Sequence, residues 1–360
     1  MKAIYQKNCD WKRVARDILQ PQEVILVIGS TDVGKSTFCR FLVEEGVSQG
    51  LQVGFVDADV GQSQIGPPTT IGFKLFSEPP NWLDITAEDL YFVGSTSPER
   101  HLLQCITGVR LMVDVALATA ADVVIIDTTG YVEGSGAIAL KQHKIELVRP
   151  SVLVCIQRFY ELDPIVAGFD ACDFMQVHHL SSPQTVTSKT NKFRRKHREA
   201  YFNHYFSETV EEILPFEQVC GQRSTFLAGR PVGTDELKNL SDLAEDRVLY
   251  AAWVHRTLAL VTRTALSTEI QARIKSHLGL TNLVAEVPGY FENRCVGLVN
   301  SVGKMVSLGI IQTVDFQANY LRIRCKAGAA SETKLVQFGQ YQQNCQIFKN
   351  TVKKRPNAFR

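Results

Sequence analysis

Residues 24–37 read VILVIGSTDVGKST, and they carry the strongest structural signal in the chain. The first five are apolar without alternation, which is typical of a strand buried on both faces of a parallel sheet. Gly29, followed after four residues by Gly34-Lys35-Ser36, completes the G-x-x-x-x-G-K-[ST] pattern. Phe38 and Phe41 then give an apolar stripe at helical spacing. The stretch therefore predicts a strand, a phosphate-binding loop and a helix.

This loop supplies the residues that we expect to bind a nucleoside triphosphate. Glycine allows the backbone N–H groups to approach a phosphate closely, and the helix adds its positive end. Lys35 is expected to place a charge on the β- and γ-phosphates, and Ser36 to offer its hydroxyl to Mg²⁺. The predicted nucleotide-binding set is Gly29, Thr31, Asp32, Val33, Gly34, Lys35, Ser36 and Thr37.

The composition is that of an ordinary globular protein. Of 360 residues, 45% are hydrophobic and 21% charged, with a net charge of +2, so a nucleic-acid surface would have to be local. The nine cysteines form no C-x-x-C pair, which favours reduced thiols over disulfides or a zinc site. Residues 1–20 do not resemble a signal peptide, and no run is long and apolar enough to span a membrane. We expect a cytoplasmic protein without a membrane partner.

Carboxylates follow two further apolar strands. Asp57 and Asp59 end the segment 53–59, and Asp127 ends the segment 123–127. Because the carboxyl ends of parallel strands meet at one edge of a sheet, these acids should lie near the phosphate-binding loop. We predict that Asp57, Asp59 and Asp127 form a magnesium site together with Ser36. Turn capping is the alternative for Asp57 and Asp59.

The rest of the chain suggests two domains. Strands near 151–156 and 174–180 bring the parallel strands to about five, alternating with helices, which indicates an α/β fold with a parallel sheet flanked by helices. The segment 63–72 is interpreted as a rigid loop, and 91–93 as a strand that ends in hydroxyl groups. We expect a lead-in helix within 1–20, a P-loop domain over 21–215 and a β-rich domain over 216–360, with short alternating strands from 295 onward.

A basic segment closes the first domain. Residues 188–198 contain six lysines or arginines and no acid, and a helix would place Arg194 and Arg198 on one face. The segment is either a solvated helix or part of a lid, at about 183–206, that closes arginines over phosphates. The P-loop upstream favours the lid.

Five segments in this order resemble the polynucleotide 5′-hydroxyl kinases, the family of the RNA kinase subunit of the pre-mRNA cleavage machinery and of nucleolar rRNA-processing kinases. The segments are Gly29–Thr37, Asp57–Gln62, Gly94–Pro98, Thr128–Gly134 and Phe193–Arg198. The resemblance runs from about Trp11 to Phe206, and more loosely beyond. It implies transfer of the γ-phosphate of ATP to the 5′-hydroxyl end of single-stranded RNA or DNA, by a short form that lacks the large N-terminal domain of eukaryotic members.

The resemblance also implies roles for matching positions. Lys35 would hold the phosphates, Asp59 would orient and deprotonate the 5′-hydroxyl, and Arg194 and Arg198 would steady the γ-phosphoryl group. The implied substrate-binding residues are Gln62, Thr96, Ser97, Tyr131, Lys189 and Arg195. Tyr131 stands where these kinases usually have a tryptophan that stacks on the terminal base. Asp127 stands where many members have asparagine, so the choice between Asp59 and Asp127 as the base stays open.

Two other function classes compete with the kinase. Asp-Thr-Thr-Gly at 127–130 resembles the switch strand of regulatory GTPases and small-molecule ATPases, but the chain has no Asn-Lys-x-Asp or Thr-Lys-x-Asp segment to read guanine. An ATP-bound scaffold in an RNA-processing complex is the other alternative, and the presence of all the expected catalytic positions disfavours it. The preferred nucleotide, the choice of RNA or DNA, the protein partners and the oligomeric state stay open.

Overall fold

The computed structural model describes residues 9–82 and 84–343, and the chain divides into two compact units between Phe202 and Asn203. The division falls within helix α7 (Asn191–Phe206). We expected a boundary at 215/216. Strand β8 (Val210–Pro215) instead pairs with β16 (Tyr320–Cys325) in the second unit, so the last strand assigned to the P-loop domain belongs to the C-terminal sheet.

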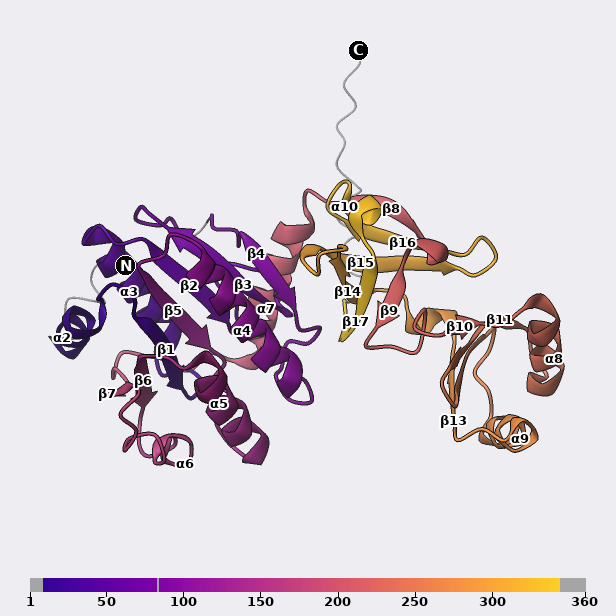
Figure 1. Ribbon diagram of the computed structural model, residues 1–360, viewed down its shortest axis with the longest axis horizontal. Helices are drawn as coiled ribbons and strands as arrows, with labels where there is room; N and C mark the ends of the chain where they lie inside the picture. Colours follow the sequence, from indigo (N-terminus) through magenta and orange to yellow (C-terminus); the bar gives the residue numbers. More distant parts are fainter. Residues whose placement is uncertain (1–8, 83, 344–360) are drawn as a thin grey trace, which may run out of the picture. The chain divides into compact units, whose positions relative to one another are not determined.

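The first unit is built on a seven-stranded sheet (Figure 1). Its order is β4 (Asp89–Phe92), β3 (Thr70–Phe76), β2 (Val53–Ala58), β5 (Val123–Thr128), β1 (Val24–Gly29), β6 (Val152–Gln157) and β7 (Gln176–Ser181). The five strands expected to be parallel are parallel. Strands β3 and β4 extend the sheet in antiparallel fashion. The expected loop 63–72 therefore ends inside β3, where Ile71 and Phe73 are buried.

Two apolar layers cover this sheet. Along β1, Ile25 and Val27 pack toward one face and Leu26 and Ile28 toward the other, as alternation in a strand requires. The first face carries α2 (Cys9–Ile18) and α3 (Lys35–Ser48), which confirms the lead-in helix. The second carries α4 (Leu102–Ala118), α5 (Ser135–Val148) and α6 (Asp163–Val166). The carboxyl ends of the parallel strands thus open between two rigid layers.

The second unit is rich in strands, as expected. One sheet has the order β10 (Arg230–Pro231), β11 (Val248–Val254), β12 (Thr257–Thr262) and β13 (Asn282–Glu286). The other has the order β8, β16, β15 (Met305–Asp315), β14 (Arg294–Val299), β17 (Leu335–Gln342) and β9 (Cys220–Gln222). Helices α8 (Thr234–Ala244) and α9 (Thr268–Leu278), which we did not anticipate, pack with the four-stranded sheet, and α10 (Ala329–Glu332) with the other. No helix in the described part of the chain is both long and apolar enough to cross a membrane.

Candidate active site

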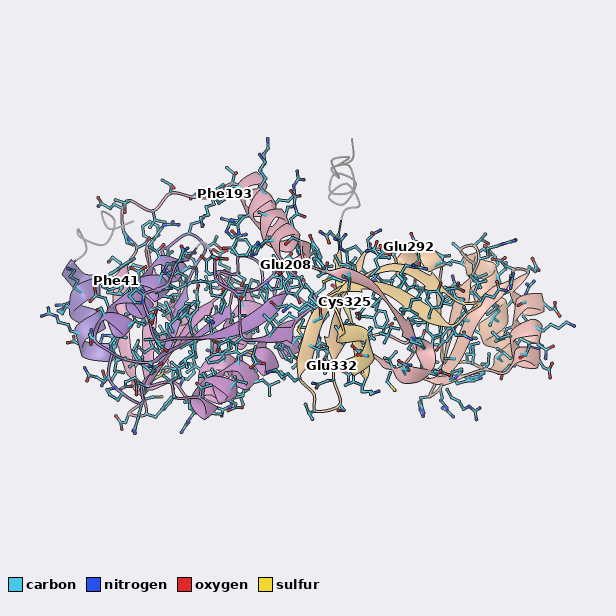
Figure 2. All side chains as sticks on the ribbon, turned by 90° about the horizontal axis from the view of Figure 1, so that it is seen from above. Phe41, Phe193, Glu208, Glu292, Cys325 and Glu332 are labelled. Carbon is cyan, nitrogen blue, oxygen red and sulfur yellow. The ribbon has the colours of Figure 1, made fainter. Side chains whose placement is uncertain are left out.

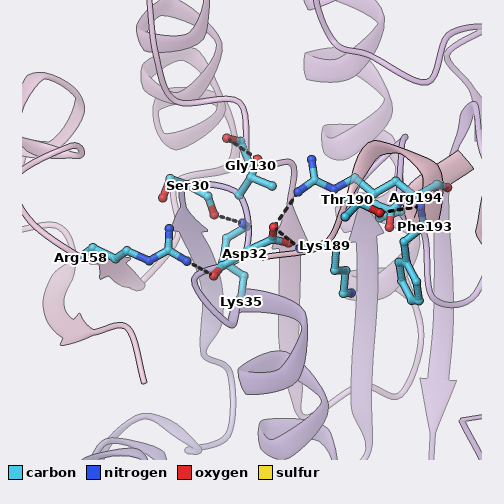
Figure 3. Close-up of polar contacts among 11 residues, drawn as sticks. Ser30, Asp32, Lys35, Gly130, Arg158, Lys189, Thr190, Phe193 and Arg194 are labelled. Carbon is cyan, nitrogen blue, oxygen red and sulfur yellow. Dashed lines mark hydrogen bonds and ion pairs between the residues drawn. The ribbon is translucent and has the colours of Figure 1, made fainter. Parts of the chain in front are cut away.

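The phosphate-binding loop connects β1 to α3 as the sequence predicts. Gly34 has φ 101° at the start of the helix, a conformation that favours glycine. A Cβ at Gly29 would lie 2.4 Å from the carbonyl oxygen of Ile156 in the next strand, so only glycine fits there. The Lys35 ammonium group donates a 2.7 Å hydrogen bond to the Ser30 carbonyl oxygen and folds over the loop (Figure 3). Burial lowers the pKa of Lys35, while Asp127 and Asp59 oppose that shift.

Asp127 is the carboxylate best suited to a divalent cation. It is fully buried, and burial raises its pKa, whereas Lys35, and more weakly the Ser36 hydroxyl, act in the opposite direction. Its Oδ1 accepts from the Thr128 N–H, and within the described chain its Oδ2 has no hydrogen-bond partner. A buried, unpaired carboxylate oxygen near a P-loop serine matches the usual magnesium environment of such folds. Ser36 and Asp127 therefore fit a magnesium ion.

Both carboxylate oxygens of Asp57 accept hydrogen bonds from the chain. Its Oδ1 accepts from the Asp59 N–H, and its Oδ2 accepts from the Ser63 hydroxyl and the Gln64 N–H. Burial, followed by the neighbouring Asp127, raises the pKa of Asp57 to about 7. Both oxygens are thus occupied in shaping the turn after β2. This geometry assigns Asp57 to turn capping and contradicts its predicted place among the metal ligands.

Asp59 remains available to a substrate. Its Oδ1 accepts 3.0 Å hydrogen bonds from the N–H groups of Gly61 and Gln62, which fix the carboxylate. No described residue donates to its Oδ2. A Cβ at Gly61 would lie 2.7 Å from the Thr96 carbonyl oxygen, so the Asp59 turn packs directly against the segment of Thr96 and Ser97. The predicted base and the predicted phosphodiester clasp are therefore neighbours.

Helix α7 brings the basic segment over the P-loop. Arg194 Nη2 lies 2.6 Å from Asp32 Oδ2, which also accepts a 2.9 Å hydrogen bond from the Lys189 N–H (Figure 3). The Gln62 side chain donates to the Arg194 carbonyl oxygen at 3.4 Å, and within the described chain its buried Oε1 has no partner. Asp32 thus holds the lid onto the loop.

These elements enclose one cavity of about 810 Å³. Its lining contains most of the predicted site residues: Thr31, Asp32, Gly34, Lys35, Ser36, Thr37, Asp59, Gln62, Thr96, Ser97, Tyr131, Lys189, Arg194 and Arg198. Val33 lies outside the lining because its side chain is buried in the core. Arg195 also lies outside the lining. It is 67% exposed and pairs with Glu199 at 3.6 Å, which contradicts its assignment to the substrate site.

Some lining residues escaped the sequence analysis. Arg158, just past the end of β6, donates to the Asp32 carbonyl oxygen (Figure 3). Its position at the carboxyl end of a parallel strand was a signal that we did not use. Lys141 lies behind the lining, fully buried in α5, and donates to Thr128 Oγ1 at 2.8 Å and to the Thr129 carbonyl oxygen at 2.7 Å. It anchors the segment that follows Asp127.

Comparison with known proteins identifies the family. Residues 29–208 match the model of the mRNA cleavage and polyadenylation factor CLP1 P-loop. A polyribonucleotide 5′-hydroxyl-kinase of Methanocaldococcus jannaschii is 31% identical over 310 residues, which cover 86% of this chain and 82% of the relative. The chain belongs to this kinase family. The suspected resemblance is confirmed, and with it an ATP-using P-loop fold.

Other members are similar over different lengths. The Clp1 polyribonucleotide 5′-hydroxyl-kinase of Bos taurus is 31% identical over 195 residues, which cover 51% of this chain and 44% of the relative. The solved structure of the Clp1p–Pcf11p complex matches with a TM-score of 0.60 at 12% identity, and the match covers 95% of this chain and 79% of that chain. At 12% identity, the similarity to the Clp1p–Pcf11p structure concerns the fold alone.

Proposed function

We propose that this protein is an ATP-dependent polynucleotide 5′-hydroxyl kinase that transfers the γ-phosphate of ATP to the 5′-hydroxyl end of single-stranded RNA. The observation that carries the proposal is a single cavity shared by Lys35, Asp59, Arg194 and Arg198. A phosphate anchor, a carboxylate and lid arginines are the parts that phosphoryl transfer to an alcohol requires. Named relatives that act on RNA 5′-hydroxyl ends support the choice of acceptor.

The nucleotide would occupy the P-loop side of the cavity. Lys35 and the N-terminus of α3 would bind its phosphates. Ser36 and Asp127 would hold Mg²⁺, which neutralises charge on the phosphates when it is bound. Asp59 is close enough to affect the pKa of Lys35. We assign it to the acceptor because the hydrogen bonds from Gly61 and Gln62 use its Oδ1, and no residue in the described part of the chain donates to its Oδ2.

The acceptor would occupy the opposite side. Asp59 would accept a hydrogen bond from the 5′-hydroxyl and align its oxygen for attack on the γ-phosphorus. Because an alcohol is a far weaker acid than a carboxylic acid, the proton would move late, as the new P–O bond forms. Thr96 and Ser97 would bind the first phosphodiester, and Tyr131 would stack on the terminal base. Arg194 and Arg198 would stabilise the charge that spreads over the γ-phosphoryl oxygens.

Transfer of labelled γ-phosphate tests this function. ATP would be offered with a short 5′-hydroxyl RNA, a matched DNA and a 5′-phosphorylated control. Label is expected on the 5′-hydroxyl RNA alone or on both 5′-hydroxyl strands, with loss of transfer in Asp59→Asn, and the ratio of RNA to DNA gives the acceptor preference. Phosphate release that does not require an oligonucleotide would indicate an ATPase. Tight ATP binding without phosphate transfer would indicate a scaffold. A cytoplasmic location is also proposed. None of the seven cysteines whose side chains the structure describes forms a disulfide, which supports it.

A further inference from the structure

An exposed aromatic side chain projects from the lid beside the cavity. Phe193 is 51% exposed at the start of α7 and belongs to none of the hydrophobic clusters of the described chain. It is labelled on the lid helix in Figure 2, whereas Phe41 of α3 is buried in the core. In Figure 3 its ring and the Arg194 guanidinium leave the helix in different directions. Phe193 thus adds nothing to the described hydrophobic cores and is available for a contact outside the chain.

Two further rings lie under Phe193 on the same helical face. His197 and Tyr201 follow at intervals of four residues, which places all three rings on one stripe. The Phe193 and His197 centroids are 6.4 Å apart at 27°, and the His197 and Tyr201 centroids are 4.6 Å apart at 30°. We call this row of rings, Phe193–His197–Tyr201, the ring stack.

The ring stack lies next to a residue of the cavity lining, on a helix rich in positive charge. Lys189 lines the cavity, and its ammonium group lies 5.8 Å from the Phe193 ring centroid. The first turns of α7 carry Lys192, Arg194, Arg195, Lys196 and Arg198, against one acid, Glu199. Burial, followed by the nearby cations, lowers the pKa of His197, so the middle ring is neutral at physiological pH. Flat neutral rings bordered by cations suit a base-stacking, phosphate-tracking surface.

We propose that the ring stack on α7 is a stacking platform for the bases that follow the 5′-terminal nucleotide of a single-stranded RNA acceptor. The proposal rests on the kinase function and extends it, because the terminal base is assigned to Tyr131. The RNA would leave the cavity past Lys189, stack a following base on Phe193, and place its phosphates near the basic side chains of α7 other than Arg195, which pairs with Glu199. Affinity would then depend on bases beyond the first, without regard to their sequence.

Binding of a 3′-labelled 5′-hydroxyl RNA decamer, measured with ADP present, tests the platform. A base stacked on an aromatic side chain typically loses a factor of about 5 to 100 in affinity when that side chain is removed. Phe193→Ala is therefore expected to weaken RNA binding by about 5- to 100-fold. Abasic sugars at positions 2–4 should weaken binding to the unaltered protein similarly, yet add little in Phe193→Ala. Phe193→Trp should bind like the unaltered protein, and Phe193→Leu like the alanine variant. Leu117→Ala removes an exposed apolar side chain of α4 outside the cavity and should change nothing.

The outcomes separate the platform from the kinase function. If no 5′-hydroxyl strand is phosphorylated by the unaltered protein, the proposed function fails. If the decamer is phosphorylated but binds Phe193→Ala as tightly as the unaltered protein, the kinase stands and the platform is refuted. Full binding by Phe193→Leu would also refute stacking and would indicate an apolar contact, such as one with a protein partner. Equal denaturation midpoints for all variants would exclude unfolding as the cause of any loss.

Discussion

Replacing Arg194 with alanine removes the lid cation whose position is best defined in the structure. Its guanidinium group uses one nitrogen for the 2.6 Å contact with Asp32, and its side chain is 25% exposed, so other N–H groups stay free for a γ-phosphoryl group in the cavity. A cation that acts only when charge spreads over the transferring phosphoryl group should change kcat and leave ATP binding almost unaltered.

The expected loss of kcat in Arg194→Ala depends on the arginine that remains in the cavity, Arg198. Arginines of this kind contribute about 10³–10⁵ in kcat to phosphoryl transfer. Because Arg198 also lines the cavity and retains part of that stabilisation, the lower end applies: about 10³ in kcat, or about 4 kcal/mol of barrier. Arg194→Lys should recover only part of the loss, since lysine keeps the charge but not the two-pronged geometry.

Steady-state kinetics with ATP and a 5′-hydroxyl RNA provide the measurement, and Arg195→Ala provides the matched control. Arg195 is the next residue of the same helix, but it is exposed, pairs only with Glu199 among the described residues and lies outside the cavity lining. Loss of this exposed ion pair should cost only about 0–1 kcal/mol of stability. Because Arg195 does not line the cavity, kcat should stay nearly unchanged. Equal losses in the two variants, or a raised KM for ATP with unchanged kcat in Arg194→Ala, would refute the geometric argument.

The remaining predictions concern the acceptor side, the buried lysines and the P-loop. Asp59→Asn should lower kcat by about 10²–10⁴ with little change in ATP affinity, and isothermal titration beside initial rates would show whether the loss lies in binding instead. Lys144→Met should raise the free energy of unfolding by about 1–3 kcal/mol, because the buried Lys144 ammonium has no hydrogen-bond partner among the described residues. Burial lowers the pKa of Lys144, so the unfolded chain binds more protons, and the gain should shrink as the pH rises toward 10.5. Lys141→Met removes two hydrogen bonds and should lower the free energy of unfolding. Urea titrations measure both lysine variants, and a higher free energy of unfolding for Lys141→Met would contradict the reasoning. Gly130→Ala would place a Cβ 2.7 Å from P-loop backbone atoms and should reduce both stability and ATP binding. Gly168→Ala, which has open space around it, should change neither.

The phosphate-binding loop could be predicted because its geometry is local. Strand, glycines, lysine and helix lie within fourteen consecutive residues, and each has a fixed physical role at a fixed spacing. The parallel direction of these strands then follows from their alternation with helices. The antiparallel β3 was missed because the preceding residues, 63–69, have a loop composition that continues into the start of the strand.

The errors in the site arise where long-range contacts decide the role of a residue. Asp57 looks like half of a metal-binding pair, but the chain returns so that Ser63 and Gln64 occupy its Oδ2. Arg195 looks equivalent to Arg194 in a basic run, yet one step of about 100° around a helix turns it away from the cavity. Neither outcome could follow from residue type and spacing alone.

Asp32 connects the P-loop to the lid through its side chain. Its carboxylate accepts from the Arg194 guanidinium and from the Lys189 N–H, more than 150 residues away along the chain. An arginine brought over an empty cationic loop would face Lys35 without a partner, which like charges disfavour. With Asp32 as its partner, Arg194 lies over the loop with its charge paired. A triphosphate in the cavity would add a second anionic partner through the N–H groups that Asp32 leaves free, so Arg194 could bind it with only a small rearrangement of hydrogen bonds.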